Sequence, residues 1–360
     1  MKSSPDGVRE HLIASIRGSS VVIPDLAKLM SHWPAHVNPH IDKLDAKVHE
    51  ILEAILTRPE DARRLQIMKK SKFALFAASW WPFASLEALL TTTHLVIWLF
   101  LWDDETDSHE FSSIFDNFEQ SCDFRKETLA YLRASLSQQR AAEPSQVSNN
   151  PIIANFQPVA DAITKSYTND QTQVFFEELQ LYIEMTEEEH RLQTTNQLPS
   201  PSEYMRRRMG SSAVRVCLAI QEYTLSIEVP IEAMRSDLMQ AIWNETNIII
   251  SVSNDILSIK KEIDQSQVDT LIPVLFLQGG SLQDAVDQAT NMVRAAVERF
   301  DAAEKSMHEC FAASPETLES VRRFIDNCKH GCTANFNWSM SSGRYKLPSL
   351  SKTGNMEIDL

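Results

Sequence analysis

SLEALLTTTHLVIWLFLWDDETD, residues 85–107, is the stretch that decides the fold class. Up to Trp102 it is apolar on nearly every side, as in a helix that is buried all round, and it then ends abruptly in acid. Pro82 marks a break shortly before it. We therefore expect a central, buried helix whose carboxyl end carries a cluster of carboxylates.

The rest of the chain predicts an all-α protein. Glycine accounts for only 8 of the 360 residues, well below the average of about 7%, and strand-like alternation between turn signals is rare. Amphipathic periodicity predicts helices at residues 41–56, 155–169, 172–194, 202–222, 231–263, 281–310 and 314–337. The polar stretch Ser135 to Pro151 predicts a long surface loop.

The chain is expected to form one domain. Residues 1–60, interrupted by Pro24, Pro34, Pro39 and Pro59, predict an N-terminal arm with a single helix that belongs to the same domain. Residues 61–346 contain the remaining helices and form the main part, and residues 347–360 are expected to be a flexible C-terminal tail.

Charge and cysteine content narrow the classes of function. A formal net charge of −15 repels phosphate backbones and excludes nucleic acid as an expected partner. The first residues have no uninterrupted apolar region typical of a secretory signal, and the longest strongly apolar run, Leu95 to Trp102, is far shorter than the roughly 20 residues of a membrane span. Five cysteines, an odd number, favour free thiols in a reducing compartment. We expect a cytoplasmic protein without stable membrane insertion, and we interpret CKHGC (Cys328 to Cys332) as ordinary core or surface rather than a zinc site.

The acidic end of the central helix is a candidate metal site. Asp103 and Asp107 are four residues apart and share a helix face, whereas Asp104 points about 100° away and could support the other two. A solvated acidic helix end is the alternative, but the apolar lead-in places these carboxylates at the edge of a core, where divalent cations would neutralise them.

A second stretch, VSNDILSIKKE (Val252 to Glu262), carries the complementary pattern. Asn254, Ser258 and Glu262 recur every four residues, so they lie on nearly one helix face amid apolar neighbours. An amide, a hydroxyl and a carboxylate are oxygen donors of the kind that Mg²⁺ prefers.

Together these two stretches resemble the aspartate-rich motif and the Asn-Ser-Glu triad of class I terpene synthases, particularly fungal sesquiterpene synthases. NDILSIKKE fits the family pattern for the triad at every position. EYMRRRMGSSAVRV places Arg208 at the family's spacing for a diphosphate-sensing arginine, and NWSMSSGRYKL supplies its Arg-Tyr pair, Arg344 and Tyr345. The four motifs occur in the family's order and span nearly the whole chain.

The resemblance implies a helical bundle around a central active-site cavity, with Mg²⁺, as three ions, for its cofactor. It implies metal ligation by Asp103, Asp107, Asn254, Ser258 and Glu262. Contacts to the substrate diphosphate are implied for Arg208, Lys261, Arg344 and Tyr345. Guanidinium groups suit bidentate oxyanion contacts, an ammonium suits a point-charge contact, and a phenol can donate one hydrogen bond.

Further residues match family positions near the hydrocarbon. Phe76, Phe100 and Trp338 match cavity aromatics, which stabilise cations without acting as bases, although any single aromatic in a helical core is more often packing. After Arg208 the family has a linker and a catalytic effector residue with a carbonyl at a helix break. Here these are Ser211 and Ser212, where relatives often have Asp and Gly.

The implied function is a lyase that ionises a linear isoprenyl diphosphate, most commonly farnesyl diphosphate in this family, and cyclises the carbocation to a sesquiterpene hydrocarbon or alcohol. A diterpene synthase using geranylgeranyl diphosphate is the alternative, and a non-catalytic helical scaffold would be the alternative of another class. A chain-elongating prenyltransferase would show a second DDxxD motif where this chain has NDILSIKKE, which argues against that class. A class II cyclase would show a DxDD motif, which this sequence lacks. A homodimer is left open.

Overall fold

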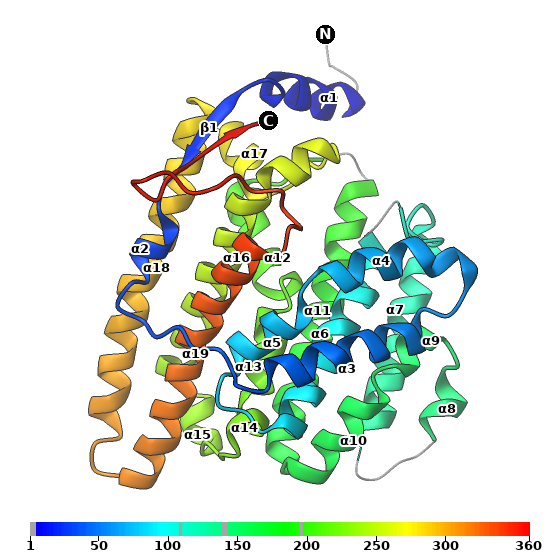
Figure 1. The fold of residues 1–360 in the computed structure, drawn as a ribbon, viewed down its shortest axis with the longest axis vertical. Coiled ribbons are helices and arrows are strands. Elements are labelled where there is room, and N and C mark those ends of the chain that lie inside the picture. Colours follow the sequence, from blue (N-terminus) through cyan, green and yellow to red (C-terminus); the bar gives the residue numbers. More distant parts are fainter. Residues whose placement is uncertain (1–4, 108–109, 138–142, 195–196) are drawn as a thin grey trace.

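The computed structural model describes residues 5–107, 110–137, 143–194 and 197–360, and its regular structure is almost entirely helical (Figure 1). The longer helices are α3 (Ile41–Ile55), α6 (Leu86–Asp107), α7 (Phe118–Leu136), α11 (Asn169–Thr194), α16 (Asp237–Asp264), α18 (Leu282–Cys310) and α19 (Pro315–Ser341). The shorter ones are α1 (Pro5–Ile16), α2 (Leu26–Leu29), α4 (Ala62–Lys70), α5 (Phe73–Trp80), α8 (Pro144–Val147), α9 (Pro151–Ala154), α10 (Gln157–Ser166), α12 (Pro201–Ser211), α13 (Val214–Ala219), α14 (Gln221–Leu225), α15 (Ile231–Met234) and α17 (Leu271–Phe276), with a 3-10 turn at Pro59–Asp61. The all-α prediction is confirmed.

Helix α6 is the buried helix that the sequence predicts. Trp98 and Trp102 are fully buried within it, and its apolar residues belong to one continuous core. Among the described residues it is the one helix long and apolar enough to cross a membrane by length and composition, but most of its surface is covered by neighbouring helices. Its acidic last turn therefore emerges from the interior of the bundle.

Helix α16 organises the other side of the bundle. It packs against α12, α13, α18 and α19, while α19 also packs against α5, which in turn contacts α6 (Figure 1). The two motif-bearing helices, α6 and α16, are thus linked through α5 and α19, although they are far apart in the sequence.

The predicted continuous helix at residues 202–222 is wrong. The chain instead forms α12, α13 and α14, because Ala213 adopts a left-handed conformation with φ 58° that a helix cannot contain. No glycine or proline occupies this position, so the helical periodicity of this stretch gave no sign of the break.

A second predicted helix, residues 231–263, is also interrupted. Helix α15 ends at Met234 and α16 starts at Asp237, because Ser236 acts as an N-cap whose hydroxyl accepts a hydrogen bond from the Met239 N–H. In the expected surface loop, α7 ends at Leu136 and α8 begins at Pro144; residues 138–142 lie outside the described residues.

The termini differ from the expected single-helix arm and flexible tail. The N-terminal segment holds α1, α2, α3 and the strand β1 (Ser20–Ile23), and the C-terminal segment holds the strand β2 (Met356–Asp359). The two strands pair in antiparallel register, from Ser20 opposite Asp359 to Ile23 opposite Met356, and lie together beside α18 (Figure 1). Short-range patterns could not show this pairing because each strand has its partner at the other end of the chain.

Candidate active site

The predicted site residues converge on one cavity of about 250 Å³. It is lined by every candidate named from the sequence: Phe76, Phe100, Asp103, Asp107, Arg208, Ser212, Asn254, Ser258, Lys261, Glu262, Trp338, Arg344 and Tyr345. A second, outer cavity of about 700 Å³ shares Asp103, Asp107, Lys261 and Arg344 with it, so these polar residues form the boundary between the two.

The last turn of α6 brings two desolvated carboxylates to the cavity. Burial, followed by repulsion from Asp104 and Glu189, raises the pKa of Asp103 to about 6. Burial and then Asp103 and Glu189 raise the pKa of Asp107 well above its usual value. Such groups bear their negative charge only at a cost, and that cost falls when a cation is close.

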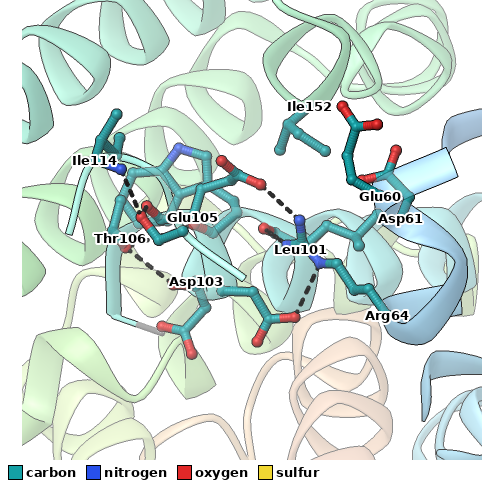
Figure 2. Close-up of polar contacts among 12 residues, drawn as sticks. Glu60, Asp61, Arg64, Leu101, Asp103, Glu105, Thr106, Ile114 and Ile152 are labelled. Carbon is teal, nitrogen blue, oxygen red and sulfur yellow. Dashed lines mark hydrogen bonds and ion pairs between the residues drawn. The ribbon is translucent and has the colours of Figure 1, made fainter. Parts of the chain in front are cut away.

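The other two acids of this turn are directed elsewhere. Arg64, on α4, is buried and pairs through Nε with Asp104 at 3.2 Å and through Nη1 with Glu105 at 2.6 Å, and it also donates to the Leu101 carbonyl. Figure 2 shows this network, with the Asp103 carboxylate pointing away from Arg64. The guanidinium thus separates the supporting acids from the pair that faces the cavity.

Helix α16 presents the second set of oxygen donors. The Ser258 hydroxyl donates to Glu262 Oε1 at 2.6 Å, and Asn254 Nδ2 donates to the Tyr345 hydroxyl at 2.8 Å. Burial, and then Asp255, raises the pKa of Glu262 to about 7. Glu262 Oε2 is buried and makes no hydrogen bond of good geometry in the described part of the chain, although the nearby Thr270 hydroxyl lowers the pKa of Glu262 slightly against the effect of burial. An unpaired, desolvated carboxylate oxygen fits a cation ligand.

The oxygen donors of α6 and α16 suit a divalent metal only when the two helices are taken together. Among the described residues there is no group of three or more His, Cys, Asp or Glu side chains that could hold a metal ion by itself. Carboxylates are supplied by both helices, and Asn254 and Ser258 add neutral oxygens. Magnesium is usually bound through a few carboxylates together with substrate phosphate oxygens, so an incomplete protein cage agrees with such a site.

Arg208 is held between α12 and α16. Its Nη2 donates to Asn254 Oδ1 at 2.9 Å and to Asp255 Oδ1 at 3.0 Å, while the Tyr204 hydroxyl donates to Asp255 Oδ2 at 2.7 Å. Burial lowers the pKa of Arg208, but Asp255 and nearby anions outweigh burial and raise it. The guanidinium therefore stays charged beside the α16 donor face.

Two further cations stand at the boundary of the cavities. Burial and the neighbouring Arg344 lower the pKa of Lys261, and the Arg344 guanidinium lies 5.1 Å from the centre of the Phe100 ring. Two like charges at a cavity mouth repel each other, so an anion bound between them would be stabilised.

The apolar wall is built from packed rings. Phe76 and Trp338 have centroids 5.2 Å apart at nearly a right angle, and Phe100 and Trp338 are 5.9 Å apart. Trp80, which the sequence analysis did not select, also lines the cavity, 5.1 Å from Phe76. Its spacing of four residues from Phe76 on α5 was the signal that could have identified it.

Comparison with known proteins agrees with this geometry. A family model described as terpene synthase family 2, C-terminal metal binding, matches residues 94–299, which include the candidate oxygen donors of both α6 and α16. The chain belongs to the terpene synthase family. It is of the class I type, and the protein is an enzyme, a carbon–oxygen lyase.

Individual relatives of this terpene synthase cover nearly its whole length. It is 31% identical to sesquiterpene cyclase hepA of Aspergillus oryzae over 346 residues, 94% of this chain and 92% of that protein. It is 25% identical to terpene cyclase braA of Annulohypoxylon truncatum, over 95% of this chain and 90% of that one. The fold is similar to that of α-eudesmol synthase, with TM-score 0.74, 20% identity and coverage of 86% of this chain and 98% of that one.

Other residues of the terpene synthase cavity were not selected from the sequence. They include Tyr182, Glu189, Gln193, Tyr204 and Cys217. Tyr182 donates to Asp103 Oδ1 at 3.4 Å and Gln193 donates to Asp107 Oδ1 at 3.3 Å, so α11 contacts the acidic turn of α6 directly. These residues form no sequence motif, and only the packing of α11, α12 and α13 around the cavity reveals them.

Proposed function

We propose that this terpene synthase ionises farnesyl diphosphate with Mg²⁺ and cyclises the resulting carbocation to a sesquiterpene, releasing diphosphate. One observation carries the proposal: a single cavity is lined by the oxygen donors of α6 and α16, by four side chains that could donate hydrogen bonds to a diphosphate, and by aromatic rings. The similarity to a protein named sesquiterpene cyclase supports the C15 substrate, and geranylgeranyl diphosphate is the alternative.

The polar residues would act at the diphosphate end. Asp103 and Asp107 on α6 and Asn254, Ser258 and Glu262 on α16 would hold Mg²⁺, as three ions. When bound, the metal neutralises charge on the diphosphate and makes it a better leaving group.

The chain's own cations would complete this neutralisation. Arg208, Lys261 and Arg344 are placed to bind diphosphate oxygens, and Tyr345 to donate one hydrogen bond. As the C–O bond breaks, its electron pair leaves with the diphosphate, and these preorganised donors stabilise the developing charge.

The apolar part of the cavity would shape the hydrocarbon. The faces of Phe76, Phe100, Trp80 and Trp338 stabilise an allylic cation without removing a proton, and their packing excludes water. The resemblance to class I terpene synthases implies that Ser212, at the helix break, is the effector residue whose backbone carbonyl faces the substrate. We further propose that the enzyme acts in the cytoplasm, and we leave a homodimer open.

The test is incubation of purified protein with farnesyl or geranylgeranyl diphosphate and Mg²⁺, followed by gas chromatography with mass detection of an organic overlay and measurement of released diphosphate. A cyclic C15 product from farnesyl diphosphate supports the proposal. A cyclic product from geranylgeranyl diphosphate alone would replace it with the diterpene alternative, and no product or diphosphate release from either substrate would refute both.

A further inference from the structure

The break between α12 and α13 releases backbone groups that a continuous helix would pair. In an unbroken helix the Met209 carbonyl would accept from the Ala213 N–H. Instead, Ala213 has φ 58° and its N–H donates to the Gly210 carbonyl at 3.4 Å. The Met209 carbonyl and the Val214 N–H, at the start of α13, are left without helical partners.

One buried side chain of α16 satisfies these groups. Asn247 Nδ2 donates to the Met209 carbonyl at 2.6 Å, and the Ser212 hydroxyl donates to Asn247 Oδ1 at 2.8 Å. The Val214 N–H in turn donates to the Ser212 hydroxyl at 3.3 Å. Asn247 is fully buried, so this closed set of hydrogen bonds is shielded from water and hard to replace.

The carbonyls next to this set are free. Within the described residues, no hydrogen bond to the carbonyl of Ser211 or of Ser212 is found. Both residues line the cavity, with Ala213 and Val214 beside them. The hydrogen bonds of Asn247 therefore hold in place a backbone segment whose unpaired carbonyl groups, those of Ser211 and Ser212, border the cavity.

Asn247 also connects this segment to the diphosphate end. It lies two helical turns before Asn254, so both residues are on nearly one face of α16. The same rigid helix thus sets the position of the helix break and of the oxygen donors.

We propose that Asn247 is a positioning residue for cyclisation: by holding Met209 and Ser212 it fixes the helix break against the reacting hydrocarbon. The inference rests on the proposed function. Ser212 is part of the same device, because its hydroxyl donates to the Asn247 amide oxygen and accepts from the Val214 N–H.

The first variant is Asn247→Leu, whose side chain has the same branched arrangement of heavy atoms and cannot form either hydrogen bond. We expect kcat for farnesyl diphosphate to fall by about 10- to 100-fold through misplacement of the break, while KM changes by less than about threefold because the diphosphate contacts remain. The decisive readout is the product ratio: acyclic and early-quenched products should increase relative to the main cyclic product.

The second variant, Ser212→Ala, removes one bond of the set and tests the same idea if Asn247→Leu does not fold. We expect the same shift toward acyclic products, and Ser212→Thr, which keeps the hydroxyl, should restore the wild-type ratio. The matched control is Thr246→Val, next to Asn247 on α16 and equally buried, whose hydroxyl donates to the Ile242 carbonyl of its own helix and interacts with the Cys328 thiol. Its product ratio should stay that of the wild type.

The outcomes separate the two proposals. If wild-type protein makes no terpene from either diphosphate, the proposed function fails. If the wild type is active but Ser212→Ala and any folded Asn247→Leu keep its product ratio, the positioning role is refuted. A loss of activity with an unchanged ratio, or a ratio that Ser212→Thr does not restore, would equally refute it, because those results indicate a purely structural role or a steric effect.

Discussion

At the residue scale, Glu262 combines burial, a raised pKa and an oxygen that makes no hydrogen bond of good geometry among the described residues. Glu262→Gln keeps its shape and removes its charge. We expect kcat/KM to fall by about 100-fold or more, while helicity by circular dichroism is unchanged. Glu245→Gln, on the same helix but paired with Arg299, is the control and should keep activity. Full activity of Glu262→Gln would remove Glu262 from the metal set.

His330 is a buried base that the site does not use. Burial, followed by His36, lowers its pKa to about 4, and its Nδ1 has no hydrogen bond in the described part of the chain. His330 takes up a proton near pH 6.5 in the unfolded chain but not in the folded chain. The free energy of unfolding is therefore unaffected by His330 above pH 6.5, and it decreases as the pH falls from 6.5 toward 4.

We therefore expect the wild type to lose about 2 kcal/mol of unfolding free energy between pH 7.5 and pH 5 through this histidine. His330→Phe should remove that part of the pH dependence, whereas His11→Gln, at an exposed position, should retain it. Urea unfolding at both pH values measures the difference. An unchanged pH dependence in His330→Phe would contradict the assignment.

At the element scale, Arg64 fixes the acidic end of α6 to α4. Arg64→Met would leave Asp104, Glu105 and the Leu101 carbonyl without their donor, and we expect a loss of about 3 kcal/mol in unfolding free energy. Arg63→Met, at the neighbouring position, is exposed and pairs with Glu110, so it should cost less than about 1 kcal/mol. Equal losses in the two variants would argue against a special role for Arg64.

Gly331 allows α19 to approach α5. A Cβ at this position would lie 2.8 Å from Cε2 of Trp80, which lines the cavity. We expect Gly331→Ala to destabilise the protein by about 1–3 kcal/mol and to alter the product ratio by displacing the Trp80 ring. Gly331→Ala combined with Trp80→Phe should recover part of the stability. Gas chromatography and thermal unfolding measure the two effects, and an unchanged stability would show that the interface absorbs the methyl group.

The sequence predicted the elements that repeat a local pattern. The buried α6 and the four-residue recurrence on α16 follow from periodicity, and all the candidate residues line one cavity. What the sequence missed depends on long-range partners. The break at Ala213 is stabilised by Asn247 on another helix, and Tyr204 and Tyr182 have polar partners on α16 and α6. Such contacts leave no periodic signal.

At the scale of the whole molecule, the chain ends lie beside the segment that connects α16 to α17. Arg9 pairs with Asp269 at 3.2 Å, Arg17 donates to the Ile263 carbonyl, and Lys260 donates to the Asp359 carbonyl at 2.6 Å. Asp269, with Gln267 and Thr270, also lines the cavity. The terminal segments thus support a wall of the active site, although they carry no motif.

Removing the last eleven residues, 350–360, deletes β2 and leaves β1 unpaired. We expect faster amide hydrogen exchange at residues 264–270 and a melting temperature lower by several degrees, because fewer contacts restrain that segment. A truncation ending before Met356 should behave like the full deletion, whereas removal of Leu360 alone should have a small effect. Unchanged exchange at residues 264–270 would show that the terminal sheet does not restrain them.

The pairing of β1 with β2 also has a consequence for the order of events at the ribosome. Ile23 is made long before its partner Met356. Trp338 and Tyr345, which complete the cavity, also come late. The nascent chain must therefore remain without a finished cavity until these residues have been made, and its exposed apolar helices would then depend on chaperones for longer than in a protein with local contacts.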